Sequence, residues 1–279
     1  MKLTAFLGSS KQGHTSEVMN FTLSAIQRVL PEAEIETVFL SDYPIPFCTG
    51  CHLCIFHGEQ LCPHHSSMST LEEKLLASDG VILASPGYMF SVTGIMKNFL
   101  DHAAYTCHRP KYAGKSLLCI SACTVWQKKS VFAPMKAWGD ASGFASVHQA
   151  YAELLPLPMQ TKALDKQKKR LCRTAEKFAE SLKRDRVKTL KLSDLMVFKA
   201  FSMLSQAAPN LMKADAEYYR QFSSSALWHS PAHIPVGTRL TAKILSSRMN
   251  KSIGRIVDFE AAERCNISQR VRKLTEEEE

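Results

Sequence analysis

The sequence contains no apolar run of about 18 residues, the length that a helix needs to cross a bilayer. Its first segment, Lys2 to Leu7, reads as a strand and lacks the basic start, long apolar stretch and cleavage site of a signal peptide. A GxGxxG fingerprint, a Walker loop and nucleic-acid-binding motifs are absent as well. We therefore expect a cytoplasmic protein without a membrane-spanning helix, a membrane partner or a nucleic-acid partner.

Arrangements of catalytic side chains are also missing. The sequence shows no Ser/His/Asp set, no nucleophile elbow and no zincin motif. No side chain is therefore predicted to be catalytic.

Strand-like and helix-like segments alternate through the first 185 residues. Strands are predicted at 3–7, 34–40, 80–85, 116–123 and 146–154, and helices at 17–30, 69–78, 94–105, 131–139 and 161–186. Near-continuous apolar strands between helices are typical of a parallel sheet that is covered on both faces. A long cysteine-rich loop is predicted at 41–67.

The composition changes after about residue 190. Apolar residues at helical spacing predict a helix over 193–212, and a basic amphipathic helix follows at 239–257. We predict two domains, an α/β domain at 1–189 and a helical C-terminal extension at 190–279. The extension has three possible partners: the α/β core, a second subunit or a membrane surface.

Positive charge is concentrated in one stretch. The chain has a formal net charge of +9, and residues 161–191 hold 12 Lys/Arg against 4 Asp/Glu, a balance of +8. The predicted helix there presents either an ordinary solvated face or a site for an acidic partner or a membrane surface.

A glycine-containing loop, Gly8 to Ser16, joins the first strand to the first helix. It places hydroxyl groups and backbone N–H groups at a helix N-terminus, where they favour a phosphate. The alternative is that Thr15 or Ser16 only caps the helix.

Three sequence features together resemble one protein family. The loop Gly8-Ser-Ser…Gly13-His-Thr-Ser resembles the Gly-Ser-x-Arg…Gly-Asn-Thr loop of NADPH-dependent FMN reductases. The segments Ala84–Tyr88 and Ser91–Asp101 resemble that family's Ser-Pro-x-Tyr and Ser-x-x-Leu-Lys-x-Phe-x-Asp-Arg motifs. The cysteine-rich loop resembles the insertion of the related iron–sulfur flavoproteins.

The resemblance implies a flavodoxin-like, doubly wound five-stranded parallel sheet with FMN beyond the carboxyl ends of the strands. Two groups of residues would then bind the cofactor. The residues predicted to surround the phosphate are Ser9, Lys11, His14, Thr15 and Ser16, and those beside the ring or ribityl chain are Pro86, Gly87, Tyr88 and Met89.

Four of the nine cysteines, Cys48, Cys51, Cys54 and Cys62, have the spacing C-x2-C-x2-C-x7-C. This crowding suits a 4Fe-4S cluster. Zinc is an alternative, with His52, His57, His64 or His65 as further ligands, and a metal-free loop that covers the flavin is another. The remaining cysteines are expected to be small buried residues: Cys107, Cys119, Cys123, Cys172 and Cys265.

The resemblance also implies an activity. We expect an FMN-dependent oxidoreductase that passes electrons from NAD(P)H to a quinone, flavin, metal or iron–sulfur acceptor, and that forms a homodimer or larger homo-oligomer. The alternative is an FMN/iron–sulfur electron-transfer protein that serves a protein partner and does not oxidise NAD(P)H.

Overall fold

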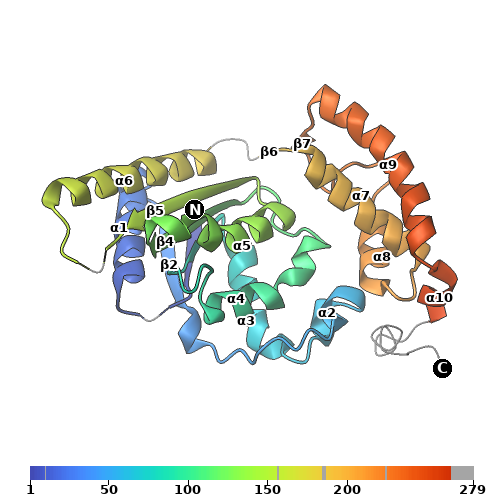
Figure 1. Cartoon of the computed structure of the whole chain (residues 1–279), viewed down its shortest axis with the longest axis horizontal. Coiled ribbons are helices and arrows are strands. Elements are labelled where there is room, and N and C mark those ends of the chain that lie inside the picture. The colour runs from blue at the N-terminus through green and yellow to red at the C-terminus, as the bar shows by residue number, and fades with distance from the viewer. Residues whose placement is uncertain (10, 156, 184–186, 224, 265–279) are drawn as a thin grey trace. The chain divides into compact units, whose positions relative to one another are not determined.

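The computed structural model describes the 279-residue chain except residues 10, 156, 184–186, 224 and 265–279. Its contacts divide it into two compact units, each built from two chain segments (Figure 1). The first unit comprises Met1–Cys48 and Ser66–Lys188, and the second comprises Thr49–His65 and the chain from Thr189 onwards. The domain limits expected from the sequence, 1–189 and 190–279, remain a prediction.

A single five-stranded sheet organises the first unit. All of its neighbouring strands are parallel, and their spatial order is β2-β1-β3-β4-β5. The strands are β1 (Lys2–Leu7), β2 (Glu34–Phe39), β3 (Gly80–Ala84), β4 (Ser116–Cys123) and β5 (Ser146–Glu153). This is the flavodoxin order, so the predicted fold class is confirmed. The chain reverses its direction across the sheet between β1 and β3, and the loops that follow these strands diverge there.

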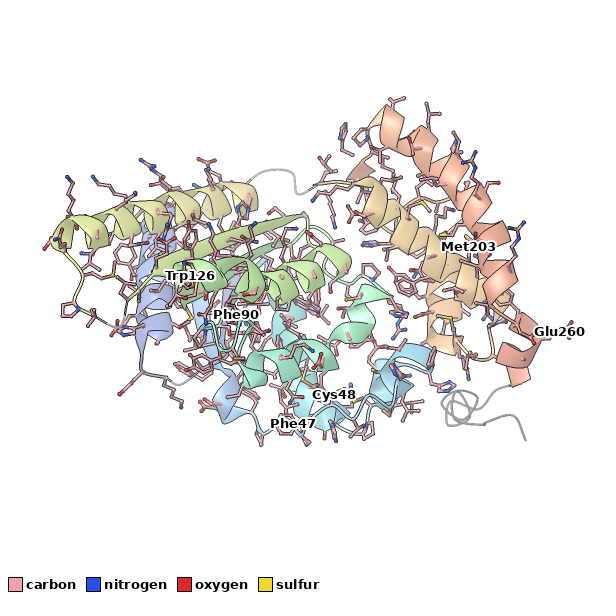
Figure 2. The ribbon with its side chains drawn as sticks, in the orientation of Figure 1. Phe47, Cys48, Phe90, Trp126, Met203 and Glu260 are labelled. Carbon is pink, nitrogen blue, oxygen red and sulfur yellow. The ribbon has the colours of Figure 1, made fainter. Side chains whose placement is uncertain are left out.

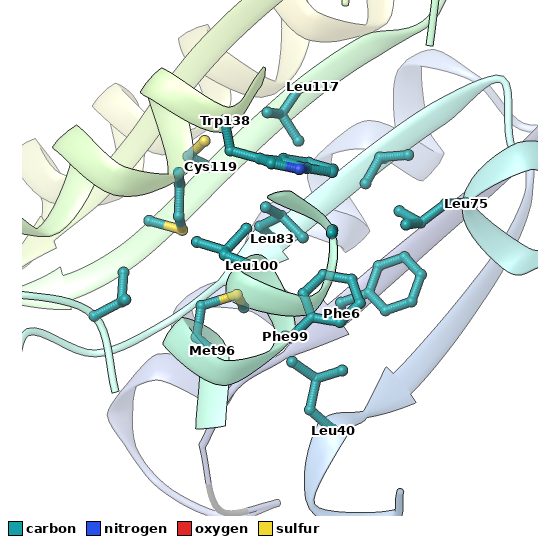
Figure 3. Packing of buried hydrophobic residues seen from close by; sticks show 14 of the residues in the cluster. Phe6, Leu40, Leu75, Leu83, Met96, Phe99, Leu100, Leu117, Cys119 and Trp138 are labelled. Carbon is teal, nitrogen blue, oxygen red and sulfur yellow. The ribbon is translucent and has the colours of Figure 1, made fainter. Parts of the chain in front are cut away.

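Five helices cover the two faces of the sheet (Figure 1). On one face lie α1 (His14–Val29) and α6 (Thr161–Lys183); on the other lie α3 (His65–Ala77), α4 (Gly94–His102) and α5 (Lys128–Ala141). Figure 3 shows the second layer, in which Phe6 of β1 stacks on Phe99 of α4 with ring centroids 5.5 Å apart. Burial of these apolar side chains stabilises the packing of the helices on the sheet.

Helices also build the second unit. They are α2 (Leu53–Phe56), α7 (Leu192–Ala207), α8 (Lys213–Arg220), α9 (Val236–Ile256) and α10 (Phe259–Arg264), with the short strands β6 (Lys188–Thr189) and β7 (Ala232–His233). Helix α7 packs against α8 and α9, and α2 packs against α8. The ring of Phe198 lies within 6 Å of the rings of Tyr219 and Trp228, so an aromatic cluster forms part of this unit's interior.

Several predicted boundaries differ from the observed ones. Helix α1 begins at His14 instead of Glu17, and the expected loop at 41–67 contains α2 and two 3-10 helices. The helix predicted at 94–105 ends at His102 and is followed by a 3-10 helix. The predicted helix end at 186, Cys265 and the final glutamates lie outside the described residues. None of the described helices has the length and apolar character required to cross a bilayer.

Candidate functional site

The loop between β1 and α1 ends at a glycine that caps the helix. Gly13 occupies the N-cap position with φ 138°, a conformation that side-chain-bearing residues rarely adopt, and no side chain caps the helix. The alternative that Thr15 or Ser16 caps α1 is therefore wrong. Both residues lie inside the first turn, where backbone N–H groups have no intrahelical acceptor. These N–H groups and the helix dipole form a site suited to an anion.

A buried hydrogen-bond network joins this loop to the neighbouring strand and helix. The N–H group of Gly8 donates to the Ala84 carbonyl at 2.8 Å. The Thr93 hydroxyl donates to the Gly8 carbonyl, and the Thr93 N–H group donates to the Ser85 hydroxyl at 3.1 Å. A Cβ atom on Gly8 would lie 2.7 Å from the Cβ atom of Met96, so only glycine permits this approach. The network fixes the ends of β1 and β3 against the start of α4.

A pocket of about 350 Å³ opens at the carboxyl ends of the strands. Its walls come from the loops after β1, β3 and β4, and from Leu154 after β5. The lining residues are Ser9, Gly13, His14, Thr15, Pro86, Gly87, Tyr88, Ala122, Cys123, Thr124, Gln127 and Leu154. Both the position and the size suit a cofactor at the switch point of an open sheet.

Six of the nine predicted FMN-binding residues line this pocket: Ser9, His14, Thr15, Pro86, Gly87 and Tyr88. The other three do not. Lys11 forms an ion pair with Asp42 at 2.8 Å, Ser16 is buried within α1, and the Met89 side chain is 89% exposed. Contact between these nine residues and FMN stays a prediction.

A second pocket of about 520 Å³ adjoins the first, because Ser9 and Tyr88 line both. Its remaining walls come from the loop after β2 and from the start of α4, and they include Tyr43, Phe47 and Ile95. No Lys, Arg, Asp, Glu or His is among the lining residues described for it. The pocket therefore suits an uncharged group better than a phosphate.

Asn98 is a structural residue of this site that sequence reasoning missed. It lies on α4 and is buried, and its side-chain amide donates to the carbonyl groups of Ile45 and Pro46 at 3.1 and 3.2 Å. Its side-chain oxygen accepts from the N–H group of Cys48 at 3.0 Å. Asn98 thus fixes the wall of the second pocket. A polar residue on the apolar face of a predicted helix was the available signal.

The loop after β3 contains a strained turn. Tyr88 and Ser91 pair through two backbone hydrogen bonds of 2.9 and 3.0 Å. Between them Met89 and Phe90 both have positive φ values, 45° and 58°. A two-residue turn of this kind normally contains Asn or Gly, and non-glycine residues there cost about 1–3 kcal/mol each. Strain of this kind gathers at functional sites.

Large apolar side chains are exposed near the mouth of the first pocket. Tyr88 lines it, Phe90 follows in the strained turn, and Trp126 precedes the lining residue Gln127 (Figure 2). Trp126 is 87% exposed. Cys123 is another lining residue of this pocket. Burial raises the pKa of its thiol, so the pocket is lined by a neutral sulfhydryl at neutral pH.

The predicted metal-binding cysteines are divided between the two units. Cys48 belongs to the first unit, and Cys51, Cys54 and Cys62 belong to the second. Cys48 is exposed, and Cys51, Cys54 and Cys62 are half-buried. Among the described residues, no group of three or more His, Cys, Asp or Glu side chains is placed to hold a metal ion. The metal site remains a prediction.

The other cysteines follow the sequence expectation only in part. Cys119 and Cys123 are buried, as expected, and burial raises the pKa of both thiols. The expectation of full burial is wrong for Cys107 and Cys172, which are half-buried because each packs against the outside of a core cluster.

Comparison with known proteins places these features in a family context. The family model described as NADPH-dependent FMN reductase matches residues 1–159. An iron-sulfur flavoprotein from Archaeoglobus fulgidus is 31% identical over 234 residues, which cover 79% of this chain and 98% of that protein. An NAD(P)H-dependent FAD/FMN reductase from Geobacillus thermodenitrificans is 25% identical over 114 residues, covering 41% of this chain and 57% of that one.

A solved oxidoreductase from Corynebacterium diphtheriae superposes with a TM-score of 0.50 at 17% identity. The match covers 65% of this chain and 97% of that structure. A likeness at this level of identity concerns the fold alone, and it agrees with the strand order described above.

Proposed function

Because the chain belongs to the NADPH-dependent FMN reductase family, we propose that it binds FMN in the 350 Å³ pocket and uses it to pass electrons from NAD(P)H to a second acceptor. Membership in this family makes the chain an NAD(P)H-dependent FMN oxidoreductase. It confirms the family and the enzyme class that the sequence predicts. The residues that hold the cofactor and the identity of the acceptor belong to the proposal.

The start of α1, which no side chain caps, is the observation that carries this proposal. An FMN phosphate carries negative charge, and the first turn offers backbone N–H groups without helical partners and the Thr15 hydroxyl at the pocket wall. Gly13 leaves this turn without a side-chain cap that would compete for the same donors. The residues present therefore fit a phosphate.

The ring of FMN would lie between the loops after β3 and β4. Pro86, Gly87 and Tyr88 form one wall, and Cys123, Thr124 and Gln127 form the other. A bound FMN supplies hydride acceptance and electron release, while the protein anchors, orients and shields it. None of the lining residues described beside the proposed ring site has an acidic or basic side chain, which is consistent with chemistry that needs no catalytic acid or base.

The acceptor is proposed to be a small uncharged molecule such as a quinone or a free flavin ring. The adjoining 520 Å³ pocket supports this choice because it has aromatic walls and no charged lining residue. A metal ion or an iron–sulfur centre remains an alternative acceptor, since the exposed rim around Tyr88 also allows electron transfer to a group outside the pocket.

Steady-state oxidation of NADPH by purified, FMN-loaded protein tests the proposal. We expect NADPH consumption that depends on FMN, with ferricyanide and a soluble quinone as acceptors. An absorbance band at about 450 nm would report the bound flavin. Protein that binds FMN but oxidises neither NADPH nor NADH would contradict the reductase function, and protein that binds no flavin would contradict the site.

A second candidate function is electron transfer to a protein partner through FMN and an iron–sulfur cluster. Two observations favour it: the C-x2-C-x2-C-x7-C spacing and the match to an iron-sulfur flavoprotein over nearly its whole length. Among the described residues, no group of three or more His, Cys, Asp or Glu side chains is placed to hold a metal ion, so the cluster stays a prediction. Iron and acid-labile sulfide analysis after anaerobic purification decides between the two candidates. About four of each per chain would support this candidate, and their absence with intact NADPH oxidation would leave only the reductase.

We also propose that the protein is a homo-oligomer with the flavin near a subunit boundary. The exposed apolar residues at the pocket mouth, Tyr88, Phe90 and Trp126, support this proposal because such side chains are commonly covered by a partner. Light scattering at micromolar concentration provides the test. A flavin-loaded monomer would refute the proposal.

A further inference from the structure

Helix α9 of the second unit carries charge of one sign only. Its 21 residues include Arg239, Lys243, Arg248, Lys251 and Arg255, and no Asp or Glu. Ordinary solvated helices mix both signs, which stabilises them through pairs three or four residues apart. Along its six turns, α9 therefore presents cations that no acidic side chain of the same helix compensates.

The inner face of α9 is covered by its own unit. Ala242 is fully buried in a cluster with Leu190 and Leu195, and α9 packs along α7 (Figure 1). This contact fixes which side of the helix points away from α7.

The outer face has an apolar row in addition to the cations. Val236, Leu240 and Ile244 follow one another at intervals of four residues and are 76%, 57% and 58% exposed. At about 100° per residue, these three side chains occupy a strip roughly 80° wide. Arg239 and Lys243 lie on one side of this strip.

Arg248 and Arg255 lie within roughly 60–80° of Leu240 around the helix axis, further along the helix than the aliphatic row, which ends at Ile244. Both are exposed. A helix face that combines an aliphatic row with cations is the arrangement of helices that lie in the interface of a bilayer. There, the aliphatic side chains enter the acyl boundary and the long cationic side chains extend to the headgroups.

We propose that the outer face of α9 binds the surface of a membrane that contains anionic lipids. Nucleic acid would satisfy the cations but would leave the aliphatic row against phosphates and water. The basic stripe of α6 offers a contrast, because its cations, among them Lys166 and Lys169, line a shallow groove without exposed large apolar residues among the described ones. Of these two helices, α9 alone combines both features.

The proposed attachment is peripheral and reversible. Three aliphatic side chains bury little apolar area, so electrostatic attraction has to contribute and binding has to weaken as salt is added. The proposal selects the membrane surface from the three partners that the sequence left open for the extension, and it involves no helix that crosses the bilayer.

Co-sedimentation of the full-length, FMN-loaded protein with vesicles tests the proposal. The vesicles contain phosphatidylcholine alone, or phosphatidylcholine with about one-third phosphatidylserine. We expect binding only to the anionic vesicles. The double variant Arg239→Gln/Lys243→Gln should bind about 30-fold more weakly, which follows from the usual contribution of each cation near such a surface.

Two further variants give the test its specificity. Leu240→Gln/Ile244→Gln keeps the charge of α9 and should weaken binding at least about tenfold, because the aliphatic side chains no longer enter the bilayer. Lys166→Gln/Lys169→Gln in α6 removes the same charge as the first variant and should change binding less than about twofold. Circular dichroism and NADPH oxidation should be unchanged in all three.

Several results would overturn the proposal. Equal binding to both kinds of vesicle would exclude recognition of anionic lipid. An equal loss in the α6 variant would show attraction to the net charge alone. No binding of the wild-type protein to either kind of vesicle would exclude the membrane as partner. A smaller oligomer of Leu240→Gln/Ile244→Gln by light scattering would assign the apolar row to contact with a second copy of the chain.

Discussion

Replacing Thr15 by alanine provides a direct test of the proposed phosphate site. Thr15 lines the pocket and is 5% exposed, and its hydroxyl is not needed to cap α1 because Gly13 occupies the N-cap position. A hydrogen bond to a charged group contributes about 1.5–3 kcal/mol. Thr15→Ala should therefore weaken FMN binding roughly 10- to 150-fold.

The same substitution should cost little stability. The loss of a helix cap, about 1 kcal/mol, does not apply here, so the free energy of unfolding of the apoprotein should fall only by the usual effect of a small buried substitution, about 1 kcal/mol or less. FMN affinity is measured by quenching of flavin fluorescence, and apoprotein stability by urea unfolding.

Two comparison variants sharpen this prediction. Ser16→Ala removes the neighbouring hydroxyl, which the sequence also assigns to the phosphate but which does not line the pocket, and it should change FMN affinity much less. Ser24→Ala removes an exposed hydroxyl two turns further along α1 and should change nothing measurable. An unchanged FMN affinity in Thr15→Ala together with lower stability would refute the reasoning, because the hydroxyl would then be structural.

Three further predictions concern the loop, the pocket wall and the pH dependence of stability. Gly13→Ala places a side chain at φ 138°, so it should lower the free energy of unfolding in urea by about 1–3 kcal/mol and weaken FMN binding. An unchanged free energy of unfolding and an unchanged FMN affinity would show that the loop relaxes freely. Burial raises the pKa of the Cys123 thiol, so this thiol should react with iodoacetamide more slowly at neutral pH than a free thiol. Mass spectrometry of the apoprotein measures the reaction, and a faster reaction would contradict the prediction. The Lys74 ammonium lowers the pKa of Glu36, so this carboxylate stabilises the fold above about pH 4.5, and the effect is lost as pH falls through the lowered folded-state value. Glu36→Gln should therefore lose less unfolding free energy than the wild-type protein between pH 5 and pH 3, by under about 1 kcal/mol because the ion pair is partly exposed. The same pH dependence of stability in both proteins would count against the pairing.

The fold was predictable from the sequence because each strand of a parallel sheet is buried on both faces. Segments such as 80–84 and 116–123 are therefore almost continuously apolar and stand out between helices. The start of α1 was misplaced by three residues, since the expectation placed hydroxyl residues at the cap and Gly13 takes that position. Glycine caps a helix through its backbone conformation, and composition does not reveal that conformation.

The candidate site was predictable where its residues lie in continuous loop motifs. Ser9 to Thr15 and Pro86 to Tyr88 each belong to one loop at the end of one strand, and parallel strands bring such loops to one edge. Asn98 was missed because its hydrogen-bond partners lie about 50 residues earlier in the chain. Gln127 was passed over because only the folded loop after β4 shows that it, and not the exposed Trp126, lines the pocket.

The packing of α2 against α8 has a consequence for the order in which the protein is made. Residues 49–65 leave the ribosome early, but the helix that they contact, Lys213–Arg220, follows about 150 residues later. At ordinary rates of synthesis, the cysteine-containing segment waits roughly 8–30 s for its partner, while the first unit can already complete its sheet. During this interval the segment lacks the packing of α2 against α8. A nascent chain stopped after Lys188 should therefore contain a finished sheet and a segment 49–65 that is still open to proteases and to thiol reagents.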